Sequence, residues 1–291
     1  MRFKIDGLVA TITVFSLPYF IGSGLASTSN EFNLPQGIRG GSTNGLFNFA
    51  SDLHRRQSTD PEWLRIMPLG ASIVAGVASS PSDGFRKPLR DHLRSIGYKV
   101  NMVGSQFNMD GSMRDGDHEG HPGHRIDQIV NDIDLSNDTK PNLYLINAGT
   151  NDCQQNYLEM RGTINRLRGL VEKAWDMSTR ATIILSTLLP SDNEDQVPGA
   201  NERVSQLNIE IRELASFLNR TGSRIELAEM NDGFITNADL SCDGIHPTNA
   251  GYRKMAVVWN AAIAKAQAAH FLQDPEDNGI PDARIAITAP R

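Results

Sequence analysis

Five short apolar runs alternate with helix-like patterns along the chain, and this alternation narrows the choice of fold more than any other feature. The apolar runs, rich in Ile, Leu and Val, cover residues 64–69, 99–104, 142–149, 181–189 and 223–230. Apolar residues recur at helical spacing in the stretches 84–98, 125–133, 157–177, 202–219 and 249–271. Strands that alternate with helices pair into a parallel sheet with helices on both faces. The sequence therefore predicts an α/β protein, a three-layer α/β/α sandwich around a five-stranded parallel sheet.

The N-terminus has the order of a secretory signal peptide. Arg2 and Lys4 supply the basic start, residues 7–26 supply an apolar stretch, and small residues occupy its end. We expect residues 1–26 to be removed after Ala26, which makes the mature protein secreted and extracellular. The alternative is a signal anchor that keeps the same segment in the membrane.

One folded domain, at residues 63–271, is expected between two less regular segments. Residues 27–62 are rich in Ser, Asn and Gly and predict a poorly ordered leader, and residues 272–291 form an acidic tail. The chain is 39% hydrophobic, which is enough for a sizeable core. Its net charge of -6 argues against a dedicated nucleic-acid binder. We expect a monomer with no nucleic-acid partner and, once the signal is removed, no membrane attachment.

Three polar blocks follow predicted strands, and the carboxyl ends of parallel strands share one edge of the sheet. Ser72 follows the first strand, the Gly-Thr-Asn-Asp block at 149–152 follows the third, and Asp243 and His246 follow the fifth. Acyl transfer needs a nucleophile, a base, a group that orients the base, and donors for the oxyanion. Ser72 can serve as the nucleophile, His246 as the base and Asp243 as the group that fixes its tautomer. The Asn151 amide and the Ser72 backbone N–H can serve as oxyanion donors.

Each of these residues also has an ordinary structural explanation. The segment at 70–74 lacks the second glycine of a G-x-S-x-G elbow, and nothing beside Ser72 can act as a base. A serine in a turn, an asparagine near a helix start and a chance Asp-x-x-His pair are all common. Their shared position at one edge of the sheet is what favours an active site.

The blocks Gly-Ala-Ser, Gly-Thr-Asn-Asp and Asp-Gly-Ile-His-Pro resemble those of the SGNH hydrolases, also called GDSL esterases. The resemblance spans residues 63–270 and implies the flavodoxin-like fold of that family. It implies that Ser72, His246 and Asp243 are catalytic and that Asn151 is an oxyanion donor. Ala71 departs from the pattern, because the family usually has an aspartate there. In the family that aspartate braces the loop, so its loss implies a looser loop in which the proton-transfer groups are intact.

A further stretch, EGHPGHRIDQI at 119–129, is similar to secreted members of carbohydrate esterase family three. In those proteins the glycine before x-R-I is an oxyanion donor, and the matching residue here is Gly123. The segments GFRKPLRDHL, VNMVGS and LINAGTNDC resemble the same subfamily. The resemblance implies a serine esterase that removes acetyl groups from xylan or related polysaccharides without a cofactor. The alternatives are a lipid or aryl-ester hydrolase of the same fold and a catalytically silent carbohydrate-binding protein.

The two cysteines and two asparagines gain meaning if the protein is secreted. Cys153 and Cys242 are the only cysteines, so in an oxidising compartment they are expected to form one disulfide. Given the resemblance, that bond would tie the loop of the oxyanion donor to the loop of the base. The alternative is two free buried thiols. Asn137 and Asn219 stand in N-x-Thr sequences and are candidate glycosylation sites.

A histidine-rich cluster precedes the predicted helix at 125–133. His118, Glu119, His121 and His124 do not have H-E-x-x-H spacing, and Pro122 breaks any helix that would align them. A solvated loop near the substrate cleft explains the cluster, and no metal is expected there.

The acidic tail contains a second candidate for a metal ion. Asp274, Asn278 and Asp282 offer oxygen ligands in a turn-rich stretch that is similar to short calcium loops. The glutamate that usually completes such a loop is replaced by Ile285. A plain acidic tail without bound calcium is the favoured interpretation.

Overall fold

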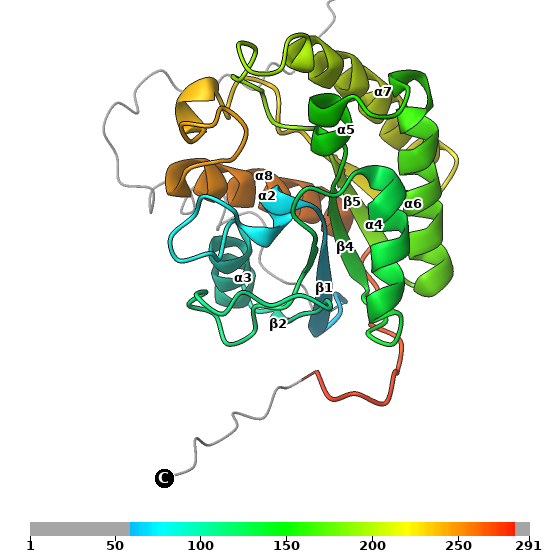
Figure 1. Ribbon diagram of the computed structural model, residues 1–291. Helices are drawn as coiled ribbons and strands as arrows, with labels where there is room; N and C mark the ends of the chain where they lie inside the picture. Colours follow the sequence, from blue (N-terminus) through cyan, green and yellow to red (C-terminus); the bar gives the residue numbers. More distant parts are fainter. Residues whose placement is uncertain (1–58, 283–291) are drawn as a thin grey trace, which may run out of the picture. The chain divides into compact units, whose positions relative to one another are not determined.

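The computed structural model describes residues 59–282, and the structural statements below concern that part of the chain (Figure 1). Its strands all pair in parallel and comprise β1 (Trp63–Gly70), β2 (Lys99–Met102), β3 (Glu119–Gly120), β4 (Leu143–Asn147), β5 (Thr182–Ser186) and β6 (Ile225–Ala228). The order across the sheet is β2-β1-β4-β5-β6, with the short strand β3 paired to the end of β1. The predicted five-stranded, flavodoxin-like sandwich is confirmed. Strand β3 was not predicted, because its 2 residues are too few to show a period.

Helices cover both faces of this sheet (Figure 1). One face carries α3 (Arg86–Ser95) and α8 (Asn249–Ala268), and the other carries α4 (Ile126–Asp132), α6 (Thr163–Met177) and α7 (Ala200–Arg220). Two short helices, α2 (Ser72–Ala75) and α5 (Thr150–Gln155), follow β1 and β4 directly, and short 3₁₀ turns lie at Ile133–Ser136, Met160–Gly162 and Asn237–Asp239. The helix predicted at 157–177 begins later, at Thr163. Asn156 ends α5 in the left-handed conformation, which separates the two helices.

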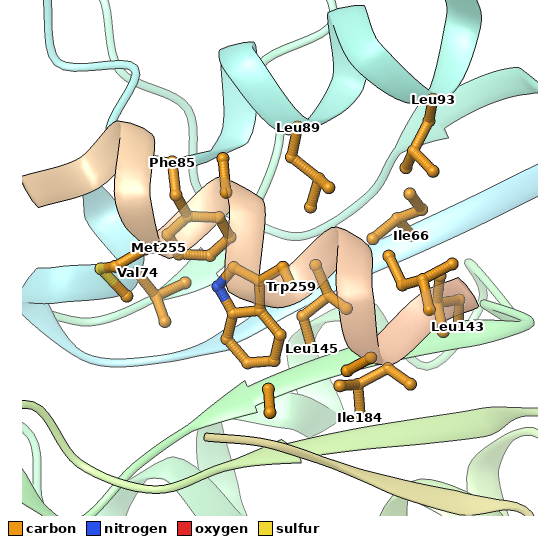
Figure 2. Close-up of a cluster of buried hydrophobic side chains, with 14 of the residues drawn as sticks. Ile66, Val74, Phe85, Leu89, Leu93, Leu143, Leu145, Ile184, Met255 and Trp259 are labelled. Carbon is orange, nitrogen blue, oxygen red and sulfur yellow. The ribbon is translucent and has the colours of Figure 1, made fainter. Parts of the chain in front are cut away.

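Two buried apolar clusters, one on each face of the sheet, form the core. Successive residues of β1 point to opposite faces, so Leu64 and Ile66 enter one cluster while Met67 and Leu69 enter the other. Figure 2 shows the first cluster, in which Trp259 from α8 lies among side chains of the sheet and of α3. The strands are buried on both faces, which explains why their sequences read as continuous apolar runs.

Residues 272–282 lie along the amino-terminal edge of the sheet and are attached there by Arg65 of β1. The Arg65 guanidinium donates to both carboxylate oxygens of Asp282, at 2.6 and 2.8 Å, and to the backbone carbonyls of Thr139, Lys140 and Glu276. The Asn101 amide of β2 also donates to Asp282, at 2.9 Å.

The contacts of the tail disfavour the calcium candidate. The Asp282 carboxylate is already neutralised by a buried arginine, and Asn278 donates its amide to the carbonyls of Asp138 and Thr139. The Asn278 side-chain oxygen accepts from the Ile280 N–H, so it is turned into the tail's own backbone. The Asn278 and Asp282 oxygens thus already serve separate partners within the protein.

Some sequence predictions fall outside residues 59–282, and one is disfavoured within them. The expected signal at 1–26 and all but the last residues of the leader lie outside the described residues. No described helix combines the length and apolar character needed to cross a bilayer. Asn219 is half-buried, and its amide donates to the Ile225 carbonyl at 2.7 Å, which argues against glycosylation there. Asn137 is exposed, and its glycosylation stays a prediction.

Candidate active site

Ser72, His246 and Asp243 form one hydrogen-bonded path, although 174 positions separate the serine from the histidine. His246 Nε2 lies 2.8 Å from Ser72 Oγ, and His246 Nδ1 lies 2.7 Å from Asp243 Oδ2. Both nitrogens of the imidazole are thus engaged, one by a hydroxyl and the other by a carboxylate. This is the geometry in which a serine hydroxyl can pass its proton to a histidine whose tautomer is fixed.

The turn that carries Asp243 and His246 is closed by its own backbone. The Asp243 Oδ1 atom accepts the backbone N–H groups of Ile245 and His246 and the hydroxyl of Ser241. Partial burial disfavours the charged carboxylate, but the hydrogen bonds from His246 and from these other donors outweigh it. The pKa of Asp243 therefore lies well below its usual range, and the group stays anionic as a partner for His246.

Ser72 begins α2 at the point where β1 meets its neighbours most closely. Gly70, the last residue of β1, pairs with Gly120 and with Asn147. A side chain at Gly70 would collide with the Asn147 carbonyl and with Val74, so only glycine fits this approach. The sharp exit after Gly70 places Ser72 at the carboxyl edge of the sheet, beside the switch point between β1 and β4.

The loop that follows Ser72 is braced without the aspartate that the family usually has at position 71. The buried Arg86 guanidinium donates to the carbonyls of Ala75 and Ser82, at 3.1 and 2.7 Å. Asn108 donates to the same two carbonyls, at 2.5 and 2.7 Å, and the Tyr252 hydroxyl donates to the Val77 carbonyl at 2.7 Å. These side chains hold the loop through its backbone carbonyls, and the effect of Ala71 stays a prediction.

Arg86 was not identified from the sequence as part of the site. Burial lowers its pKa to about 10, with Asp83 acting in the opposite direction, so it remains charged at neutral pH. The sequence does contain an indication that Arg86 is buried. It lies three positions before Leu89 and seven before Leu93, which puts it on the buried face of α3. A charged residue on an apolar stripe needs buried partners, and here the partners are backbone carbonyls around the Ser72 loop.

Gly123 and Asn151, the two predicted oxyanion donors, lie in the turn after β3 and in the first turn of α5. The His121 N–H donates to the Gly70 carbonyl at 3.0 Å, which continues the pairing of β1 with β3 and brings the 121–124 turn to the end of β1. Gly123 has a φ of 84°, with open space where a Cβ would stand. Glycine is therefore favoured here by the left-handed backbone conformation and not by lack of space. Asn151 Nδ2 donates to the His124 carbonyl at 2.9 Å, which ties α5 to this turn and leaves its second N–H available.

The histidine-rich cluster is ordered by carboxylates. His121 Nε2 lies 2.5 Å from Glu119 Oε1, and His124 Nδ1 lies 2.7 Å from Asp132 Oδ2. Glu119 is fully buried and also accepts from the hydroxyls of Ser105 and Ser136. Burial disfavours its charge, but the hydrogen bond from His121 and the serine donors outweigh it and lower the pKa of Glu119. The hydrogen bond to Glu119 in turn raises the pKa of His121 against the effect of burial.

His121, His124 and Asp132 are the residues of the described chain that could hold a metal ion. Their ligand atoms lie within 4.8 Å of one another, although no helix passes through Pro122, as expected from the sequence. The turn at Pro122 brings them together instead, with the two imidazoles stacked 5.4 Å apart. Each histidine already has a carboxylate partner, which explains the cluster without a metal ion.

The comparison with known families follows this geometry. Residues 69–254 match the GDSL-like Lipase/Acylhydrolase family. The chain belongs to this family. The match includes Ser72, Gly123, Asn151, Asp243 and His246, and the predicted resemblance to SGNH hydrolases is confirmed.

Carbohydrate esterases are among the family members that this chain is similar to. It is 28% identical over 228 residues to a multidomain esterase of Ruminococcus flavefaciens, a match that covers 70% of this chain and 29% of that protein. The chain thus spans less than a third of that relative's length. Among solved structures, a Clostridium thermocellum family 3 carbohydrate esterase aligns with a TM-score of 0.61 at 25% identity, over 71% of this chain and 98% of that one. A carbohydrate esterase family 3 protein from Talaromyces cellulolyticus shares the fold, with a TM-score of 0.58 at 22% identity over 72% and 98%.

The predicted disulfide of this GDSL-like protein is wrong, because both cysteines are free. Cys153 faces inward from α5 into the second core cluster and is fully buried, whereas Cys242 is exposed on the turn before Asp243. Burial raises the pKa of the Cys153 thiol to about 12, with the nearby Asp152 adding to the effect, so the thiol is inert. Both cysteines adjoin site residues in sequence, but their side chains point into different surroundings.

Proposed function

We propose that the protein is a secreted serine esterase that removes acetyl groups from carbohydrate, with Ser72 as the nucleophile. The observation that carries the proposal is the hydrogen-bonded path from Asp243 through His246 to Ser72. Family membership supports ester hydrolysis, and the likeness to a family 3 carbohydrate esterase supports an acylated sugar as substrate. The signal-like segment at 1–26 supports secretion.

In the first half of the reaction, His246 Nε2 takes the proton of the Ser72 hydroxyl while Oγ attacks the acetyl carbonyl. Asp243 stays ionised and stabilises the imidazolium that forms. The negative charge on the carbonyl oxygen is held by the backbone N–H groups of Ser72 and Gly123 and by the Asn151 amide. His246 then gives its proton to the departing sugar oxygen, which leaves the acetyl group on Ser72.

In the second half, water replaces the sugar and the same groups act again. His246 removes a proton from the water molecule, and the hydroxide attacks the acetyl carbonyl of the acyl-enzyme. When the tetrahedral intermediate collapses, the proton returns to Ser72 Oγ and acetate leaves. Every proton is carried by His246, so the reaction requires no cofactor.

The exposure of the reacting groups favours a large substrate. The Asp243 side chain is 42% exposed and that of His246 is 17% exposed, so the path ends close to the surface of the protein. An acetyl group that projects from a polymer can reach such a site without threading the chain into a cavity. A long acyl chain would require a deep apolar pocket to shield it from water.

The deciding experiment measures acetate release by the mature chain from acetylated xylan and from a small aryl acetate. Ser72→Ala tests the nucleophile, and Ser205→Ala on the exposed face of α7 is the matched control. We expect the wild type and the control to cleave both substrates, and Ser72→Ala to cleave neither above the background rate. Cleavage of the aryl ester alone would retain the esterase mechanism and reject the carbohydrate substrate. Binding of the polysaccharide without acetate release would favour a silent carbohydrate-binding protein.

A further inference from the structure

An exposed tyrosine stands at the far end of the short helix that starts in the candidate active site. Helix α5 begins with Thr150 and Asn151 and ends at Gln155, so it is about 9 Å long. The left-handed Asn156 then turns the chain outward, and Tyr157 is 72% exposed. An aromatic ring this open offers a flat apolar face on which a ligand can pack.

The Tyr157 ring is held in place from one side. The Arg125 guanidinium lies over the ring, 4.6 Å from its centroid. Arg125 is itself fixed, because Nε and Nη2 donate to the two carboxylate oxygens of Asp127, at 3.0 and 3.2 Å, and Nη1 donates to Gln155 at 2.8 Å. One face of the tyrosine is therefore occupied by a rigid cation, and the opposite face is available to solvent.

The same contacts connect Tyr157 to the predicted oxyanion turn. The Gln155 side chain accepts from Arg125 through its oxygen and donates through Nε2 to the Gly123 carbonyl, at 2.7 Å. The aromatic ring and the oxyanion glycine are thus joined by two side chains. The orientation of the Tyr157 ring is therefore coupled to the turn that holds Gly123.

We propose that Tyr157, backed by Arg125, is a subsite that stacks against a sugar ring adjacent to the acetylated one. The proposal rests on the proposed function and specifies how the polymer is held. The C–H face of a sugar ring is apolar and fits the open face of the aromatic ring, while Arg125 holds the ring from the opposite face. Asn156, Tyr157 and Glu159 are all exposed, whereas an acyl chain would require an enclosed apolar pocket.

The test compares kcat and KM of Tyr157→Ala on acetylated xylan and on a small aryl acetate. Stacking acts on the ground state and the transition state alike, so we expect KM for the polymer to rise about three- to tenfold with kcat unchanged. Aryl acetate does not reach the subsite, so its kinetics should stay as in the wild type. Tyr157→Trp should restore the polymer KM. Phe217→Ala, which removes an exposed aromatic ring from α7, is the matched control. It should leave kcat and KM unchanged for both substrates.

Two outcomes would overturn the subsite while retaining the esterase. The first is an unchanged polymer KM in Tyr157→Ala. The second is an equal loss on both substrates, which would mean that Tyr157 only supports the oxyanion turn through Arg125 and Gln155. If the wild type cleaves the aryl ester but not the polymer, the carbohydrate substrate itself is wrong and the subsite is rejected with it.

Discussion

The two edges of the sheet carry similar charged and polar side chains in opposite arrangements. At the amino-terminal edge, Arg65 and Asp282 are enclosed, and each nitrogen of the guanidinium donates to a carboxylate or a carbonyl. At the carboxyl-terminal edge, the path from Asp243 through His246 ends at the Ser72 hydroxyl, where an ester can approach. A charge whose partners are all protein groups stabilises the fold, whereas a path that ends on one reachable atom can carry out chemistry. The comparison predicts that substitutions at one edge affect stability and those at the other affect turnover.

The largest effect is expected from His246→Ala. Removing the base should lower kcat at least about a thousandfold, equivalent to roughly 4 kcal/mol of transition-state stabilisation. The free energy of unfolding should change by less than about 1 kcal/mol, because His246 lies at the surface of the domain. Kinetics on an aryl acetate and urea denaturation measure the two quantities, and the exposed His270→Ala is the matched control. A variant that lost its activity by unfolding would contradict the separation of the two edges.

Arg65→Ala should have the reverse effect. Among the described residues, Asn101 is then the remaining side-chain donor to the Asp282 carboxylate, and three backbone carbonyls lose their donor. We therefore expect the free energy of unfolding to fall by about 2–3 kcal/mol. Turnover by the folded protein should stay within twofold of the wild type. Urea denaturation measures the first effect and kinetics at low temperature the second.

The control for Arg65 is Arg168→Ala, which breaks the exposed pair with Glu172. Exposed pairs of this kind contribute little, so the loss should be below about 0.5 kcal/mol. Equal losses in both variants would mean that the contacts with the tail do not stabilise the domain.

The Glu119–His121 pair adjoins the turn that holds Gly123. Because both groups titrate, the pair should make the stability of the fold depend on pH. Hydrogen bonds lower the folded pKa of Glu119 below 4.5, so its stabilising effect is complete above that pH and is lost as the pH falls. The folded pKa of His121 is raised above 6.5, so its effect is complete below that pH and is lost as the pH rises through the raised value. The pair should therefore stabilise the fold most between these limits.

His121→Gln tests this pH dependence. The difference in unfolding free energy between wild type and variant should be larger near about pH 6 than near about pH 9, and smaller than the effect of Arg65→Ala. Denaturant titrations at both pH values provide the measurement. A difference that grew with pH would mean that His121 is held as the neutral imidazole.

The smallest effect is expected from metal removal. No step of the proposed reaction uses a metal ion, so incubation with a strong chelator should leave kcat/KM within about twofold of the untreated value. A loss that zinc ions restored, and that Asp132→Asn abolished, would show that His121, His124 and Asp132 hold a functional metal ion.

The sequence predicted the sheet and the placement of the proposed reacting residues at one edge because both follow from local patterns and strand order. Buried strands appear as continuous apolar runs, and parallel strands bring Ser72, Asn151 and His246 to one edge. The contacts that shape the site were harder to predict. Arg86, Asn108 and Glu119 act through backbone carbonyls or serines that are distant in sequence, and no period or motif records such pairings.

The wrong disulfide prediction and the disfavoured calcium candidate have a common cause. The cysteine pair and the calcium loop were both inferred from positions along the chain, and both depend on where side chains point. Cys153 turns into a helix-lined core, and Asp282 turns to an arginine more than two hundred positions earlier in the sequence. Adjacency in sequence to a functional residue does not determine the direction of a side chain.

The inequality of the two cysteines makes this chain suitable for site-selective labelling. A thiol-reactive fluorophore would attach to Cys242 on the surface and leave Cys153 unmodified inside the core. The label would then stand one residue from Asp243, at the turn that holds the proposed base. The native protein thus offers one spectroscopic reporter position beside its reacting groups, and no cysteine has to be added or removed to use it.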